Sequence, residues 1–145
     1  MTPGELTEYL HRHIPLTQAI GARVVSCEAG RVSIAAPLAP NLNHRNTAFG
    51  GSLATLGILS GWTVLHCALR EQNLDARLVV QKHECDFLEP AADELIAQSQ
   101  LPQEEWTRFL SMLQRRQRAR ISIESEIRAG GTLAVKSTGT FVGLL

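Results

Sequence analysis

The chain has 145 residues, and its 14 Lys and Arg balance 14 Asp and Glu, so its formal net charge is zero. This length predicts one domain over residues 1–145, and the neutral charge argues against a nucleic-acid-binding protein, which normally carries a basic excess. The 44% hydrophobic and 19% charged residues exclude a disordered chain. Three cysteines without a CxxC pair favour a reducing, cytoplasmic location over a disulfide framework.

The first third of the chain predicts a helix followed by a hairpin. The helix begins at Pro3, is capped by Thr2 and ends at Ile14. Two strands follow over residues 22–28 and 31–38, with alternating apolar side chains in the second and a two-residue turn ending in glycine between them. Residues 41–47 then form a polar loop rich in asparagine.

A long helix is predicted from Gly50 to about Glu71. Residues 46–69 contain no Asp, Glu, Lys or Arg, which is long enough to cross a bilayer, but the seven Asn, Ser, Thr and His residues in this stretch favour a helix buried inside a globular domain. We therefore expect no membrane interaction. Gly57 and Gly61 belong to a stripe of small residues that lets a curved sheet approach the helix backbone closely.

The second half of the chain is predicted to be mostly strand. Alternating segments cover residues 77–88 and 94–101, and a final hairpin covers 119–128 and 132–142. An amphipathic helix over 102–118 is inserted before that hairpin. The predicted fold is α+β: an antiparallel sheet of about six strands curled around one long helix, which is the hotdog arrangement, with an extra N-terminal helix and the short inserted helix.

One block of sequence carries a family resemblance. The segment Asn43-His44-Arg45-Asn46-Thr47-Ala48-Phe49-Gly50-Gly51-Ser52 resembles the loop and helix start of hotdog thioesterases. The nearest group is the thioesterase-like domain that also occurs C-terminal to GNAT-type acetyltransferase domains. The resemblance implies an enzyme that hydrolyses an acyl thioester, most of all acyl-CoA. The sequence contains no metal, flavin or nucleotide motif, so we expect no cofactor. The resemblance also implies a homo-oligomer, a dimer or a dimer of dimers, with sites at the interface.

The chemistry of thioester hydrolysis assigns roles to five residues of this block. Negative charge develops on the carbonyl oxygen, and the backbone N–H groups of Gly50 and Gly51 at a helix N-terminus are suited to stabilise it. Asn43 either polarises the carbonyl or bonds only its own loop, and His44 is a candidate general base. Ser52 either caps the helix or contacts substrate.

The helix departs from the thioesterase pattern at the residue that matters most. Phe49 replaces the family's histidine, and Ile58 stands where the catalytic carboxylate is expected. The remaining catalytic candidates are Glu84 and Asp86, which share one face of a strand, and Ser60 on the helix. The alternative for the two carboxylates is a solvated strand face, and the alternative for the Ser60 hydroxyl is a hydrogen bond to its own helical turn. The missing carboxylate keeps a non-catalytic acyl or acyl-CoA-binding module open, and a hotdog hydratase or dehydratase is a further alternative.

A basic cluster lies at the end of the inserted helix. Its arginines either bind coenzyme A phosphates or form a solvated helix end, where the helix dipole favours cations. The cluster consists of Arg115, Arg116, Arg118 and Arg120.

Overall fold

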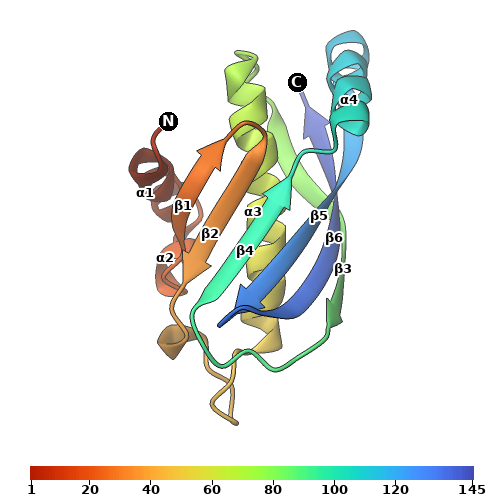
Figure 1. Cartoon of the computed structure of the whole chain (residues 1–145). Helices are drawn as coiled ribbons and strands as arrows, with labels where there is room; N and C mark the ends of the chain where they lie inside the picture. Colours follow the sequence, from red (N-terminus) through yellow and green to blue (C-terminus); the bar gives the residue numbers. More distant parts are fainter.

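The computed structural model describes residues 1–145 and contains one antiparallel sheet with the strand order β1-β2-β4-β5-β6-β3. The sheet curves around the long helix α3 (Gly50–Glu71), as Figure 1 shows. This arrangement confirms the predicted hotdog fold. The strands are β1 (Arg23–Glu28), β2 (Arg31–Ala36), β3 (Arg77–Phe87), β4 (Leu95–Gln100), β5 (Arg118–Ala129) and β6 (Thr132–Leu144).

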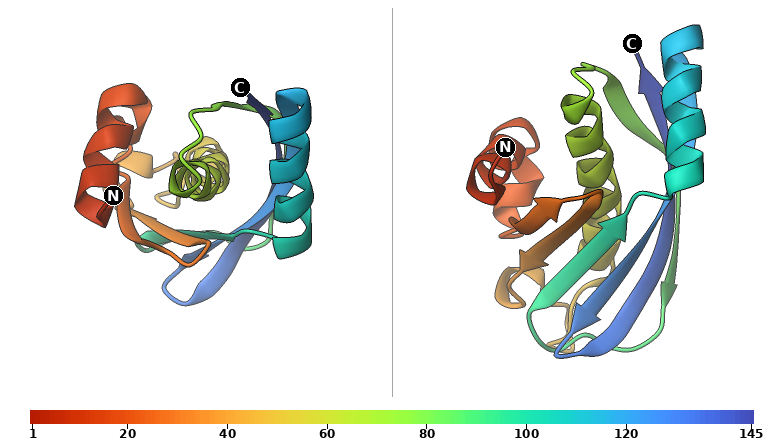
Figure 2. Two further views of the ribbon diagram at one scale, coloured as in Figure 1. Left: turned by 90° about the horizontal axis from the view of Figure 1, so that it is seen from above. Right: turned by 45° about the horizontal axis from the view of Figure 1, so that its top comes forward.

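The smaller helices flank this unit on opposite sides. In Figure 2, α1 (Pro3–His13) and α2 (Pro15–Ala19) lie beside β1, and α4 (Gln103–Arg116) lies at the far side of the sheet. A short 3-10 turn, η1 (Ala39–Asn41), precedes the polar loop. Thr2 and Glu5 form a capping box at the start of α1, so two of the amide groups left free by the first helical turn are satisfied.

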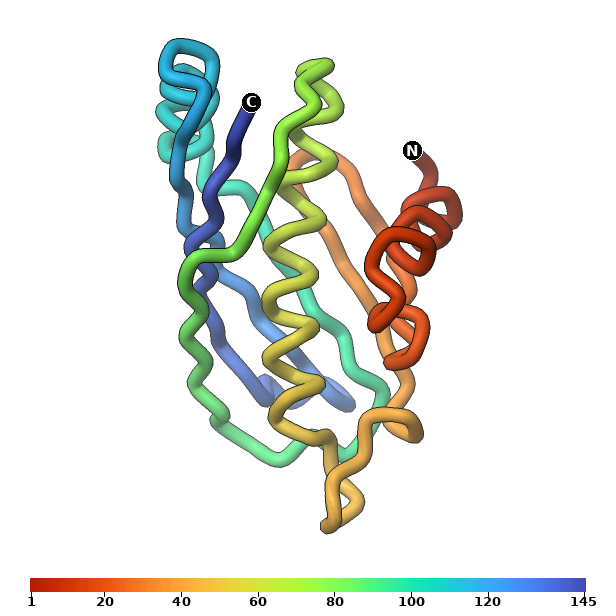
Figure 3. The backbone as a smooth tube through the Cα atoms, turned by 180° about the vertical axis from the view of Figure 1, so that it is seen from behind, coloured from red at the N-terminus to blue at the C-terminus, as the bar shows by residue number.

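The sheet packs tightly against α3 at the predicted small-residue stripe. A Cβ atom added at Gly61 would lie 3.0 Å from the Phe141 ring, and one added at Gly57 would lie 2.6 Å from the Ser137 Oγ. α3 is long and apolar enough to cross a membrane by length and composition, but 61% of its most apolar stretch is buried inside the fold. Its apolarity is thus accounted for by its place in the core, although Figure 3 shows that the sheet leaves one side of the helix uncovered.

Both tight hairpin turns have the backbone conformation that the sequence predicts. Ala29 and Gly30 have φ values of 53° and 73°, as the twist of a two-residue hairpin turn requires. The first strand begins at Arg23, one residue later than predicted. The second ends at Ala36, two residues earlier than predicted, because Pro37 cannot continue the ladder.

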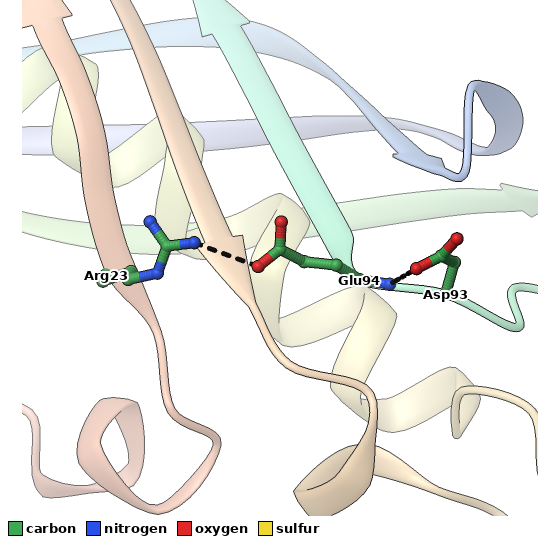
Figure 4. A network of polar contacts seen from close by, with 3 residues as sticks. All are labelled: Arg23, Asp93 and Glu94. Atoms are coloured by element: carbon green, nitrogen blue, oxygen red, sulfur yellow. Dashed lines mark hydrogen bonds and ion pairs between the residues drawn. The ribbon is translucent and has the colours of Figure 1, made fainter.

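An exposed ion pair ties the edge strand β1 to the start of β4. Arg23 Nη2 lies 3.0 Å from Glu94 Oε2, and Asp93 Oδ1 accepts a hydrogen bond from the Glu94 backbone N–H (Figure 4). Both charged side chains are about half exposed, so the pair contributes little to stability, about 0–1 kcal/mol.

Candidate functional site

The polar loop folds back on itself through the side chain of Asn43. Asn43 Nδ2 donates to Thr47 Oγ1 at 2.9 Å, and its Oδ1 accepts from the backbone N–H groups of Arg45 and Thr47. A longer contact joins Nδ2 to the carbonyl oxygen of Ala48. The side-chain amide is thereby occupied within the loop, so Asn43 shapes the segment that leads into α3.

The first turn of α3 leaves two backbone donors free. Phe49 is the N-cap residue and offers no side-chain cap, and its carbonyl oxygen accepts from the N–H groups of Ser52 and Leu53. The N–H groups of Gly50 and Gly51 make no hydrogen bond within the chain. Ser52 is the third residue of the helix, so the expectation that it caps the helix is wrong; its side chain is half-buried and makes no hydrogen bond within the chain.

Two exposed phenylalanine rings flank this glycine pair. Phe49 and Phe87 are each 56% exposed, an unusual state for such large apolar side chains. A Cβ atom added at Gly51 would collide with the Phe49 ring, and one added at Gly50 would lie 3.5 Å from the ring of Phe87. The free amides therefore lie between apolar surfaces, as a site for an acyl group requires.

Of the expected proton acceptors, the loop provides only His44. His44 is exposed and makes no hydrogen bond that would fix its ring. Ile58 is half-buried on α3, and no acidic residue takes its place, since residues 41–70 contain neither Asp nor Glu.

The structure brings a different histidine to the helix. His83 on β3 points at α3, where its Nε2 lies 3.3 Å from the position of a Cβ atom on Gly57, the neighbour of Ile58. Nε2 is buried and has no hydrogen-bond partner, whereas Nδ1 lies 3.5 Å from Cys85 Sγ. Burial lowers the pKa of His83, which keeps the imidazole neutral. The alternation along β3 indicates that His83 and Cys85 share a face, but not that this face meets α3 at Gly57.

Ser60 lies in a buried cluster of hydroxyl groups. Its Oγ is 2.8 Å from Ser99 Oγ and 3.1 Å from Ser125 Oγ, and Ser99 and Ser125 are 2.6 Å apart. Ser60 also donates to the carbonyl oxygen of Gly57. This cluster ties α3 to β4 and β5, and with its hydroxyl occupied Ser60 has no free group for substrate.

Glu84 and Asp86 do not point toward the start of α3. They alternate with His83 and Cys85, and because His83 faces the helix, the two carboxylates lie on the outer face of the sheet. Both are exposed, and Glu84 pairs with Lys82 at 2.9 Å. The structure therefore supports the solvated-face interpretation and separates these residues from Gly50 and Gly51.

The basic cluster lies far from the loop within one chain. Figure 1 shows the end of α4 and the start of β5 at the opposite end of the molecule from the loop before α3. All four arginines of the cluster are exposed, and Arg120 donates to Gln81 Oε1 at 3.3 Å. A single chain does not bring Arg115, Arg116 and Arg118 to the glycine pair.

A stack of aromatic rings lies near the other end of α3. The ring centroid of His66 is 4.7 Å from that of Trp62 and 4.9 Å from that of Tyr9, beside a cavity of about 530 Å³. His66 Nε2 is buried without a partner. Burial, and next the nearby Arg70, lower the pKa of His66 to about 4.

This histidine makes stability depend on pH. In the unfolded chain the imidazole titrates near 6.5, so between pH 6.5 and about 4 the unfolded state binds the proton and the folded state does not. The stability that depends on a neutral His66 is therefore fully present above pH 6.5 and is lost as the pH falls toward 4. The variant His66→Phe keeps a stacking ring but cannot bind the proton. When the pH is lowered from 7 to 4.5, we expect its Tm to fall by roughly 2–5 °C less than the Tm of the wild type. An equal loss in both proteins would contradict this prediction. The control is His44→Phe, because His44 is exposed and makes no side-chain hydrogen bond.

Comparison with known proteins identifies the family of the chain. A family model described as "Putative thioesterase (yiiD_Cterm)" matches residues 4–145. The chain belongs to this YiiD_C family. The resemblance seen in the loop and helix start is confirmed at the level of the family.

Solved structures of other proteins share the whole YiiD_C fold. A protein of unknown function from Chlorobaculum tepidum is 27% identical with a TM-score of 0.92, covering 99% of this chain and 96% of its own. The "putative thioesterase from Shewanella oneidensis" is 27% identical with a TM-score of 0.90, covering 99% and 97%. A thioesterase from Haemophilus influenzae, 14% identical with a TM-score of 0.78, covers 99% and 91% and shows the fold alone.

Proposed function

We propose that this YiiD_C protein hydrolyses acyl thioesters, with acyl-CoA as the substrate. The observation that carries the proposal is the pair of unbonded N–H groups of Gly50 and Gly51, which lie between exposed apolar rings in a chain of a thioesterase family. The activity requires no metal or organic cofactor.

The glycine pair acts on the carbonyl oxygen of the thioester. As water adds to the carbonyl carbon, this oxygen becomes negative, and two preorganised N–H donors with the positive end of the helix dipole stabilise it. Collapse of the tetrahedral intermediate then breaks the carbon–sulfur bond and releases the acid and the thiol. Phe49 and Phe87 contact the acyl group beside the reacting carbon, and Asn43 holds the loop that fixes the start of α3.

His83 is the proton acceptor in this proposal, taking the place of the carboxylate that Ile58 replaces. Its unpartnered Nε2 lies beside Gly57, seven residues or roughly 10 Å along the helix from Gly50. That separation is too long for a carbonyl held by the same chain, so the proposal requires a substrate bound by a partner copy and a turn of the His83 ring that exposes the Nε2 atom now buried against α3. A site shared between two copies is therefore part of the proposal.

The choice between the two histidines is tested by pH profiles. We expect His83→Gln to lower kcat about 10²–10⁴-fold and His44→Gln to leave it nearly unchanged, because general-base catalysis contributes on this scale. The base acts when it is deprotonated, and the pKa of His83 is lowered. In the wild type, kcat/KM should therefore begin to fall only below pH 6.5. The reverse ranking of the two variants would assign the base to His44. Circular dichroism of both variants is the folding control.

The edge strand β3 supports the dimer. β3 pairs only with β6, so its other side carries free backbone groups. Exposed apolar side chains accompany this edge, including Val79, Val80, Phe87 and Leu88. Four cavities of the single chain, with volumes of about 250 to 670 Å³, are lined by residues other than Gly50 and Gly51. A second copy added along β3 covers the apolar edge and completes an enclosure around the glycine pair.

A charge placed on this edge should dissociate the dimer. We expect the wild type to have the mass of a dimer or a dimer of dimers in light scattering at micromolar concentration. Val79→Lys, at a position 45% exposed, should shift the mass toward the monomer, because two symmetry-related charges meet at the edge. Val25→Lys on the opposite edge strand β1, at a position 47% exposed, is the matched control. A monomeric wild type would contradict both the dimer and the shared site.

Release of free thiol from a panel of acyl-CoA esters tests the function directly. Turnover that is lost in His83→Gln supports the hydrolase. Saturable binding of the same esters without turnover supports the alternative, a non-catalytic acyl-CoA-binding module, which the absent carboxylate at Ile58 favours.

A further inference from the structure

Two of the three cysteines lie against each other although they are far apart in the sequence. Cys27 lies on β1 and Cys67 on α3, and their sulfur atoms are 2.8 Å apart. Both thiols are free. This separation is less than 1 Å longer than a disulfide bond. The third cysteine, Cys85, has His83 as its hydrogen-bonding neighbour instead.

The surroundings of the pair allow a small oxidant to reach it. β1 is the edge strand of the sheet, and both cysteines are half-buried rather than enclosed. A cavity of about 10 Å³, close to the volume that holds one water molecule, is lined by both cysteines together with Arg31 and Glu71. A small oxidant can therefore approach the sulfurs from the side on which the two cysteines are partly exposed.

The two sulfurs differ in acidity. The hydrogen bond with Cys67 lowers the pKa of Cys27, and the same hydrogen bond and burial raise the pKa of Cys67. Cys27, with the lowered pKa, is therefore the sulfur that becomes a thiolate, and Cys67 keeps its proton. This division matches an attacking cysteine with a resolving cysteine beside it.

We propose that Cys27 and Cys67 form a site of reversible oxidation, at which hydrogen peroxide converts the two thiols into an intramolecular disulfide. The Cys27 thiolate attacks one peroxide oxygen, the O–O bond breaks, and Cys27 becomes a sulfenic acid as the first water is released. The Cys67 sulfur then attacks the Cys27 sulfur and displaces the second water. The two thiols lose two electrons and two protons, and hydrogen peroxide is reduced to two molecules of water.

The disulfide would enclose the candidate site in a covalent ring. Residues 27–67 contain the polar loop, the glycine pair and most of α3. The bond would fix the β1–β2 hairpin to the central helix and restrict the unfolded chain. Closing a ring of this length is expected to raise Tm by about 10 °C in the oxidised form. The raised Tm should return to its original value on reduction with dithiothreitol.

Thiol counting and mass spectrometry after mild hydrogen peroxide treatment test the proposal. We expect the titratable thiols of the denatured wild type to fall from three to one, with the loss of two hydrogen atoms and a peptide that links Cys27 to Cys67. Cys85→Ser should behave in the same way, with thiols falling from two to none and the same rise in Tm. Cys27→Ser and Cys67→Ser should each lose the rise in Tm.

Two results would overturn the proposal. Three thiols remaining under conditions that oxidise a model dithiol would show that the pair does not close. A disulfide that contains Cys85 or joins two chains would show that another pairing is preferred. If a single serine variant folds poorly, the peptide map of the wild type still decides, because it requires no substitution.

Discussion

Gly57→Leu is expected to unfold the protein or to lower its Tm by more than about 10 °C. Gly57 lies where α3 touches the sheet, and a Cβ atom at this position would be 2.6 Å from Ser137 Oγ and 3.3 Å from His83 Nε2. Inserting side-chain atoms into a well-packed core costs about 1–3 kcal/mol or more, against a total stability of about 5–15 kcal/mol. Thermal melting followed by circular dichroism measures the effect.

A double-mutant cycle shows whether the named contact is the cause. Gly57→Ala alone should destabilise the protein, and Ser137→Ala should relieve much of that loss because it removes the Oγ that the new methyl group meets. Ser137 Oγ has no hydrogen-bond partner, so its removal by itself should cost little. Gly4→Ala, in the exposed first turn of α1, is the control, since the nearest atom there is 4.0 Å away. An unchanged melting temperature in Gly57→Leu would contradict this packing of α3.

The fold was predictable from the sequence because its signals are local. The uncharged stretch of residues 46–69 with its small-residue stripe predicts α3, and the alternating segments with glycine turns predict the hairpins. The structure confirms both sets of elements, with shifts of one or two residues at their ends. Hydrophobic periodicity and turn residues depend on neighbours along the chain, so one sequence contains them in full.

The candidate site was less predictable because it depends on contacts between distant segments. The free amides of Gly50 and Gly51 could be expected from a helix start without a capping side chain. The hydrogen bonds that occupy Asn43 depend on the conformation of the loop. The approach of His83 to Gly57 depends on the register of β3 with β6, in which His83 lies opposite Gly139, and no local pattern specifies that pairing.

The proximity of Cys27 and Cys67 also depends on contacts between distant segments. Forty residues separate them, and their meeting requires both the position of β1 at the sheet edge and the turn of α3 on which Cys67 lies. An odd number of cysteines predicts no framework of disulfides. It does not follow that every pair is far apart.

Gly50→Pro is expected to reduce thioesterase turnover about 10²–10³-fold while the fold stays intact. Proline lacks the backbone N–H, so this change removes one of the two proposed oxyanion donors and leaves Gly51 in place. The donor makes no hydrogen bond within the chain, so its loss should not weaken the protein. Gly50 is the first residue of α3, where proline is well tolerated, and Phe49 already has the extended ψ of 133° that a residue before proline requires.

Gly50→Ala separates the loss of the donor from the addition of atoms. It retains the N–H and places a Cβ atom at an ordinary contact distance of 3.5 Å from the Phe87 ring. We expect Gly50→Ala to keep most of the turnover, and both variants to melt within a few degrees of the wild type. A decrease in kcat for proline with little change for alanine indicates a donor that acts in the transition state, because an interaction made equally with the bound substrate would appear in KM. Equal turnover in the proline variant and the wild type would remove Gly50 from the oxyanion site and leave the glycine pair with a structural role at the start of the helix.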